Sequence, residues 1–186
     1  MTTQALAFLV VNDFCPFYDD LVAQAERANY IGIHSTGIYM ERFCMAECAW
    51  AAKEIKERLG MDFDPLLAYF RQYQRGVDEV TYVHSDEAVA DYGAILSLGR
   101  SGRENGAFRL WKHKETGLEV PDSEHRLQLG AEGLDDSKWQ VEQHLELLPN
   151  RLIIYSARLF HSRHPRLWAN EWPRTVGVYF FNERRN

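Results

Sequence analysis

Residues 80–99 read VTYVHSDEAVADYGAILSLG and decide the fold class of this chain. Two short segments in this stretch, 80–86 and 92–99, are rich in β-branched and aromatic residues and flank a charged turn. No helix of crossover length separates them, so we predict antiparallel strands. Similar segments occur throughout the rest of the chain after Pro65: LLAYFRQY (66–73), GAFRLWKH (106–113), RLIIYSA (151–157) and RTVGVYFF (174–181).

The N-terminal part of the chain has a different pattern. Residues 5–11 suit a buried strand, and residues 17–29 and 46–59 place apolar side chains at helical spacing. Gly60 is a plausible stop for the second helix. The polar stretch 114–140 is expected to be a long loop with short elements. We therefore predict one domain over residues 1–186, in which N-terminal helices brace one side of a β-sandwich or barrel.

Composition excludes several functional classes. The formal net charge of −6 argues against non-specific binding of nucleic acid, which needs a basic surface. No run of eighteen apolar residues occurs, so no transmembrane helix is expected. The N-terminus lacks a basic region and meets Asp13 early, which favours a first strand over a signal peptide. Nothing in the sequence indicates an oligomeric state.

Cysteine usage points to the cytoplasm. The odd number, Cys15, Cys44 and Cys48, does not suggest a disulfide framework, so a reducing compartment is expected. Cys44 and Cys48 lie four residues apart and would share one face of a helix. We interpret them as small core residues, not metal ligands, because no second pair of soft ligands lies nearby.

The motif His84-Ser85-Asp86 is the first chemical signal. Residues i and i+2 of a strand point to the same face, so the imidazole and the carboxylate would project together. One more histidine would complete a 2-His-1-carboxylate triad, the signature of non-haem Fe(II) oxygenases, which leaves coordination positions open for ligands.

The second histidine is expected after a later strand. His161 follows the apolar segment RLIIYSA and comes directly after Phe160, which favours an inward position. His164 competes for this role, but it precedes Pro165, which suggests a turn. We therefore predict His84, Asp86 and His161 as the metal ligands.

Arg174 opens the strand RTVGVYFF, thirteen residues after His161. Strand alternation puts its side chain on one face with Val176, Val178 and Phe180. A buried arginine needs a partner, and its planar fork suits a carboxylate held in bidentate fashion. A dicarboxylate cosubstrate would supply one. If Arg174 does not bind it, the anchor is to be sought among Arg158, Arg163 and Arg166.

The chain resembles the 2-oxoglutarate/Fe(II)-dependent oxygenase superfamily, in particular its small prolyl-hydroxylase-like bacterial and phage members. The resemblance is carried by an N-terminal entry, a metal strand with its successor, a distal-histidine segment and a closing strand: VVNDFCPFYDDLVAQAERANY (10–30), VHSDEAVADYGAILSLG (83–99), NRLIIYSARLFHSRHP (150–165) and PRTVGVYFF (173–181). It covers nearly the whole chain, but only the metal and arginine motifs are specific.

The resemblance implies a double-stranded β-helix, a jelly-roll-like and cupin-like fold. It also implies that His84, Asp86 and His161 bind Fe(II), and that Arg174 binds the distal carboxylate of 2-oxoglutarate. Family members often add a polar residue from the strand before the metal motif, for which Tyr73 and Tyr82 are the candidates here. Many members place a serine two residues beyond the arginine, where this chain has Val176.

The implied reaction uses O2 and 2-oxoglutarate to oxidise a substrate C–H bond, with release of succinate and CO2. Related halogenases lack the carboxylate ligand, so Asp86 favours hydroxylation. A free amino acid, a peptide side chain or a small metabolite fits as substrate. Arg109, Trp111 and Lys112 are candidates for the pocket mouth, or else two solvated charges and a core residue.

Three rival functions remain open. The first is a non-catalytic metal-binding β-sandwich that acts as an interaction module. The second is a nucleic-acid dealkylating oxygenase, which the acidic charge and the missing second arginine of the closing segment disfavour. The third is a zinc hydrolase, because imidazole and carboxylate also suit zinc.

Overall fold

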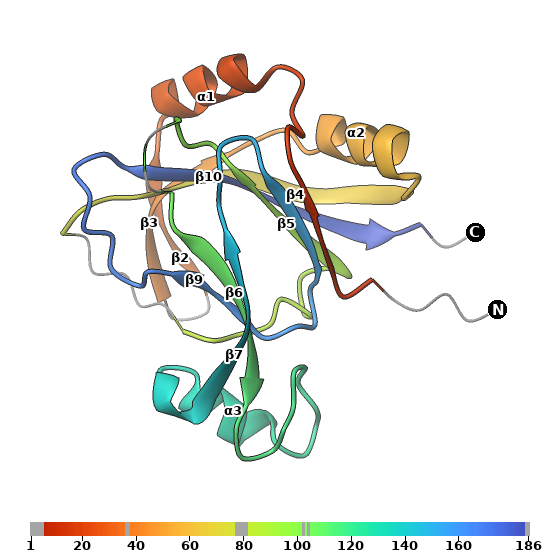
Figure 1. Ribbon diagram of the computed structural model, residues 1–186, viewed down its shortest axis with the longest axis vertical. Helices are drawn as coiled ribbons and strands as arrows, with labels where there is room; N and C mark the ends of the chain where they lie inside the picture. Colours follow the sequence, from red (N-terminus) through yellow and green to blue (C-terminus); the bar gives the residue numbers. More distant parts are fainter. Residues whose placement is uncertain (1–5, 36–37, 77–81, 102, 104, 185–186) are drawn as a thin grey trace.

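Two antiparallel β-sheets form the body of the molecule in the computed structural model, which describes residues 6–35, 38–76, 82–101, 103 and 105–184 (Figure 1). The larger sheet has seven strands within this part of the chain, in the order β1 (Phe8–Val11), β8 (Leu152–Ser156), β5 (Tyr92–Ser97), β10 (Arg174–Glu183), β4 (Phe63–Tyr73), β3 (Ile38–Met45) and β2 (Ile31–Ser35). The smaller sheet has three, in the order β7 (Trp139–Glu146), β6 (Ala107–His113) and β9 (His161–His164).

Strand β10 lies at the centre of the larger sheet, and its side chains contribute to a different apolar cluster on each face of that sheet. It pairs antiparallel with β4 and β5, and Arg174 lies opposite Tyr73. Val176, Val178 and Phe180 face the interior between the two sheets, where they pack in one cluster with residues of β6 and β8. Because side chains alternate along a strand, the intervening residues face the other side of the sheet.

Helices α1 (Tyr18–Arg27) and α2 (Ala49–Leu59) cover that other side (Figure 1). Their buried side chains pack against the outward-facing residues of β4, β5 and β10, with Leu21, Val22 and Ala25 from α1 and Ala51, Ala52 and Ile55 from α2. Gly60 adopts φ 70° directly after α2, a conformation that glycine tolerates without steric cost. Both predicted helices are therefore confirmed, within a few residues at their ends.

The predicted loop 114–140 carries a small appendage below the smaller sheet (Figure 1). It contains α3 (Arg126–Glu132) and a 3-10 turn over Asp136–Lys138. Fully buried His113 is hydrogen-bonded through Nε2 to Glu132 at 2.7 Å, and the indole of Trp139 donates to the Glu132 carbonyl at 2.9 Å. These contacts fix α3 against the end of β6 and the start of β7.

Three expectations need correction. The hairpin of β2 and β3 lies between the two helices, where no strands were predicted. Strand β7 begins at Trp139, at the end of the 114–140 stretch, and was also missed. The described residues of 80–86 do not form a strand: only His84 makes an isolated β-bridge. Strand propensity predicts that this segment is extended, but it does not predict how the segment pairs. Its one pairing residue, His84, lies opposite His161 of β9 in the smaller sheet.

None of the helices in the described part of the chain has the length and apolar character that a membrane crossing requires.

Candidate metal centre

His84, Asp86 and His161 meet at one point, and each offers a ligand atom within 4.8 Å of the others. Backbone contacts fix this meeting. The amide of His84 donates to the His161 carbonyl at 3.1 Å, and the amide of His161 donates to the His84 carbonyl at 2.8 Å. The amide of Asp86 donates to the Ala157 carbonyl at 2.7 Å. The metal motif is therefore positioned by two segments more than seventy residues further along the chain.

Both imidazoles are oriented by their second ring nitrogen. Nδ1 of His84 lies 3.0 Å from the carbonyl of Tyr82, and Nδ1 of His161 lies 2.9 Å from the carbonyl of Leu159. Nδ1 must donate to these acceptors, which leaves the Nε2 lone pairs free. The Nε2 atoms point at Asp86, at 3.6 Å for His84 and 3.1 Å for His161. Metal-ligating histidines commonly have this arrangement.

The protonation states also suit a metal site. Burial and the neighbouring His161 together lower the pKa of His84 to about 4, although the charge of Asp86 opposes the shift. Burial opposes ionisation of Asp86, but interactions with His161, His84 and Tyr155 outweigh it and hold the pKa at about 2. At neutral pH His84 is therefore neutral and Asp86 is charged, as metal ligands must be. Two imidazoles and a carboxylate fit non-haem Fe(II), and also zinc.

Tyr155 supports this centre and was not predicted from the sequence. Its side chain is 1% exposed, and its phenol donates a hydrogen bond of 3.0 Å to Oδ2 of Asp86. The tyrosine fits because residue 93 is glycine: a Cβ there would lie 2.4 Å from Cζ of Tyr155. Within RLIIYSA, Tyr155 looks like any buried strand aromatic, so no local signal marks this role.

Arg174 lies in the interior at the start of β10, as the alternation predicted, and is 3% exposed. Its terminal nitrogens donate to the carbonyls of His164 at 3.2 Å and Ala107 at 3.3 Å. Its Nε has no hydrogen-bond partner among the described residues. Burial lowers the pKa of this guanidinium to about 10. A buried cation with an unused donor is suited to an incoming carboxylate.

The two candidate tyrosines occupy different places. The ring of Tyr82 lies 4.8 Å from that of His84, measured between centroids, so this residue adjoins the triad. The ring of Tyr73 lies 5.3 Å from Cζ of Arg174 and adjoins that arginine instead.

Several other candidates lie away from the metal centre. His164 is the last residue of β9, not part of a turn, and its Nε2 lies 3.2 Å from Arg109. Arg158 and Arg166 contact the acidic residues Glu87 and Asp136. Within the described residues, the only group of three potential metal ligands is the triad, and this group contains none of the cysteines.

The residues suggested for the pocket mouth have structural partners. The indole of buried Trp111 donates to Ser162 at 2.9 Å, and Lys112 lies 3.7 Å from Glu119. Arg109 donates to His144 at 3.0 Å. The interpretation of Trp111 as a core residue, and of Arg109 and Lys112 as peripheral charges, therefore fits the structure better.

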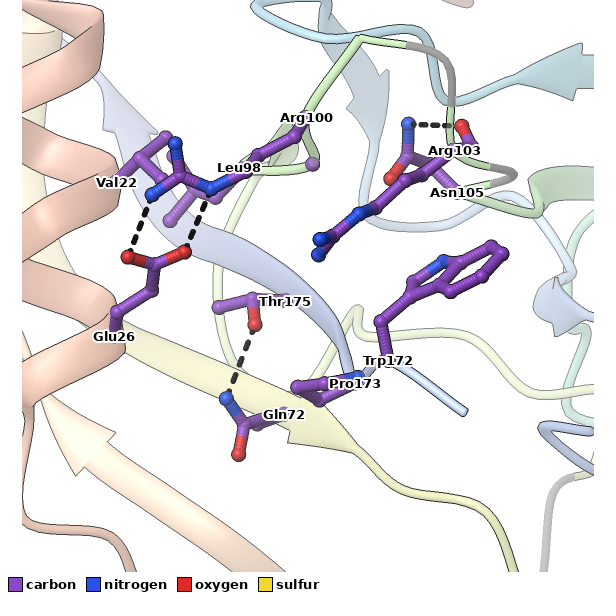
Figure 2. A pocket seen from close by; sticks show the side chains of 11 residues that line it. Val22, Glu26, Gln72, Leu98, Arg100, Arg103, Asn105, Trp172, Pro173 and Thr175 are labelled. Carbon is purple, nitrogen blue, oxygen red and sulfur yellow. Dashed lines mark hydrogen bonds and ion pairs between the residues drawn. The ribbon is translucent and has the colours of Figure 1, made fainter. Parts of the chain in front are cut away.

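Figure 2 shows a separate pocket of about 80 Å³ on the helix side of the larger sheet. Gln72 and Thr175 contribute to its wall and are joined by a hydrogen bond of 3.2 Å. They are the chain neighbours of Tyr73 and Arg174, so alternation turns them to the opposite side of the sheet. None of the three triad residues lines this pocket, which is therefore distinct from the metal centre.

Comparison with known proteins identifies the fold. No protein-family model matches the sequence, and a search of curated proteins finds no match. Solved structures do match. One is the non-haem α-ketoglutarate-dependent epimerase SnoN from nogalamycin biosynthesis, with a TM-score of 0.60 at 14% sequence identity. The match covers 94% of this chain and 76% of the SnoN chain.

Two further structures match over most of both chains. A Pseudomonas putida prolyl-4-hydroxylase has a TM-score of 0.57 at 12% identity and covers 98% of this chain and 95% of its own. HygX from Streptomyces hygroscopicus, solved with nickel and 2-oxoglutarate, has a TM-score of 0.58 at 16% identity and covers 96% of this chain and 85% of its own. The chain therefore has the double-stranded β-helix fold that the family resemblance implied.

Proposed function

We propose that this chain, which has the fold of the 2-oxoglutarate/Fe(II)-dependent oxygenases, is an oxygenase that hydroxylates a C–H bond of a small organic substrate. One observation carries the proposal: the Nε2 atoms of two oriented histidines converge on an ionised, partly buried aspartate, in the interior that also holds Arg174.

Each residue has a distinct role in this reaction. His84, Asp86 and His161 would hold Fe(II) on one face, and Arg174 would bind the distal carboxylate of 2-oxoglutarate. When bound, iron with 2-oxoglutarate and O2 supplies the oxidising chemistry. One oxygen atom enters the substrate as a hydroxyl group, the other enters succinate, and CO2 is released. The carboxylate ligand Asp86 favours hydroxylation over halogenation.

The chain's own residues orient the reactants and exclude water. The phenol of Tyr155 holds one oxygen of Asp86, which keeps the carboxylate from rotating. The ring of Phe108 packs 5.1 Å from that of His161 and 4.6 Å from that of Tyr155, measured between centroids. This apolar wall shields the buried side of the centre and strengthens the electrostatic interactions within it.

The substrate class is a small molecule, such as an amino acid, a peptide side chain or another metabolite. Support comes from proteins of the same fold: HygX has been solved with hygromycin B bound, and SnoN with nogalamycin RO. The net charge of −6 disfavours nucleic acid as substrate.

The test is succinate formation by the purified protein with Fe(II), 2-oxoglutarate and O2, with each component omitted in turn. We expect succinate only when all three are present, and a visible absorption band when Fe(II) and 2-oxoglutarate are added without O2. A band without turnover would favour a binding module. Neither band nor turnover, with hydrolytic activity on added zinc, would favour a hydrolase and contradict the proposal.

A further inference from the structure

The residues that directly precede the two triad histidines are both bonded to the appendage, residues 114–140 (Figure 1). The amide of Val83 donates to the carbonyl of Gly133 at 2.9 Å, and the amide of Phe160 donates to the carbonyl of Glu119 at 2.9 Å. The two histidines that follow are joined to each other by a pair of backbone hydrogen bonds. Two parts of the appendage therefore hold the two histidine segments side by side.

The side chains of Val83 and Phe160 also pack with the appendage. Both are buried, in an apolar cluster that they share with Leu129 of α3, Trp111 and Trp139. The rings of Trp139 and Phe160 meet edge to face, 5.0 Å apart between centroids. Neighbouring side chains of extended backbone point to opposite sides. Each residue that enters this cluster therefore turns the histidine after it away from the cluster and toward the triad.

The third triad residue has a weaker connection of the same kind. Glu87, which directly follows Asp86, accepts a hydrogen bond of 2.8 Å from Arg126 on α3. The side chain of Arg126 is well exposed, and exposed ion pairs contribute little to stability. The buried contacts of Val83 and Phe160 are therefore the ones that couple the position of α3 to the triad.

Gly133 permits the closest of these contacts. A Cβ at this position would lie 2.7 Å from the carbonyl oxygen of Val83, which is too close for two atoms that are not bonded. A side chain there would force the end of α3 and the segment before His84 apart. Metal–ligand distances vary by only about 0.2 Å. A small displacement of either histidine segment would therefore weaken metal binding.

We propose that the appendage positions His84 and His161 and thereby sets the affinity of the triad for its metal ion. Leu129 and Gly133 are the positioning residues, and they act on the triad through Val83 and Phe160. This inference rests on the metal centre of the proposed function, but not on the oxidation reaction.

The experiment uses Gly133→Ala and Gly130→Ala, a matched pair at α3. Gly133 has φ −59°, which alanine adopts freely, and a Cβ at Gly130 meets nothing within 4 Å among the described residues. Co(II) alone is titrated into each metal-free protein, and its visible absorption reports occupancy and coordination geometry. We expect Gly133→Ala to weaken Co(II) binding about 10-fold or more and to change the absorption band. Gly130→Ala should bind Co(II) as the unaltered protein does.

A second pair separates positioning from general stability. Leu129→Ala and Leu21→Ala each truncate a buried helical leucine, one on α3 and one on α1. Both should lower Tm, because each leaves a cavity, but only Leu129→Ala should weaken Co(II) binding. Leu129→Met, which nearly conserves the volume, should restore most of the affinity.

Two results would overturn the inference: Co(II) binding by Gly133→Ala that equals that of Gly130→Ala, or equal weakening in the two leucine-to-alanine variants. Succinate formation by the unaltered protein is measured separately. Its absence would contradict the oxygenase function, whereas the Co(II) comparison would still decide whether the appendage positions the triad.

Discussion

The phenol of Tyr155 donates a hydrogen bond of 3.0 Å to Oδ2 of Asp86, which lies 69 residues earlier in the chain. This contact ties the proposed metal centre to the larger sheet, in which Tyr155 lies on β8 between the edge strand β1 and β5. The two carboxylate oxygens have different neighbours: Oδ2 accepts from Tyr155, and Oδ1 lies 3.6 Å from Nε2 of His84.

Tyr155→Phe removes that hydrogen bond while it keeps the ring in place. We expect Fe(II) affinity to fall about 10- to 100-fold, since groups that orient metal ligands typically contribute this much. Folding should be little affected, because the aromatic packing against Phe108 remains. Titration with Fe(II) or a substitute divalent metal measures the change. Unaltered affinity in a folded variant would mean that Tyr155 is only a packing residue.

The triad itself is tested by four alanine variants. His84→Ala, Asp86→Ala and His161→Ala should each abolish tight Fe(II) binding and turnover, because each removes one of three ligands. His164→Ala should be much milder, since its Nε2 contacts Arg109 and lies outside the triad. Metal binding and succinate formation are measured together. Loss of both in His164→Ala, with retention in His161→Ala, would show that the distal ligand is misassigned.

Arg174→Ala should raise the 2-oxoglutarate requirement by roughly one to three orders of magnitude, because loss of one partner of a buried charged pair costs about 2–5 kcal/mol. Iron binding should be largely retained. Arg174→Lys should rescue only partly, because lysine supplies charge without the planar fork. The 2-oxoglutarate concentration for half-maximal succinate formation is the measurement. Unchanged affinity in the alanine variant would point to Arg163 as the anchor, since that arginine shares the same Tyr73 ring.

Gly106→Ala tests how Arg174 is positioned. Gly106 has φ 72°, and a Cβ there would lie 2.5 Å from the His164 carbonyl oxygen and 3.0 Å from a terminal nitrogen of Arg174. We expect destabilisation of at least about 1–2 kcal/mol from the left-handed backbone alone. The 2-oxoglutarate requirement should also rise, because the clash displaces the guanidinium.

Gly117→Ala is a matched control for that variant. It has φ 71°, but its Cβ would meet only the Lys112 side chain, at 3.9 Å. It should lose only the stability that the left-handed backbone costs, about 1–2 kcal/mol in unfolding, without any change in the 2-oxoglutarate requirement. Equal kinetic effects in the two variants would indicate that general destabilisation, and not the position of Arg174, sets cosubstrate affinity.

Local patterns in the sequence were sufficient for much of this protein. Alternation in RTVGVYFF correctly placed Arg174 with Val176 and Val178 in the interior, because side-chain direction along a strand depends only on backbone geometry. Helical spacing located α1 and α2 for the same reason. The order of His84, Asp86 and His161 indicated three residues that the fold does bring together.

Only the tertiary structure decided the surroundings of those residues. The segment around His84 and Asp86 is held by backbone hydrogen bonds to Ala157 and His161, not by membership of a regular strand. The contact of Tyr155 with Asp86 and the convergence of arginines on Tyr73 join residues from different strands and both sheets. Such contacts depend on strand order and register, which long-range packing sets and which no local periodicity encodes.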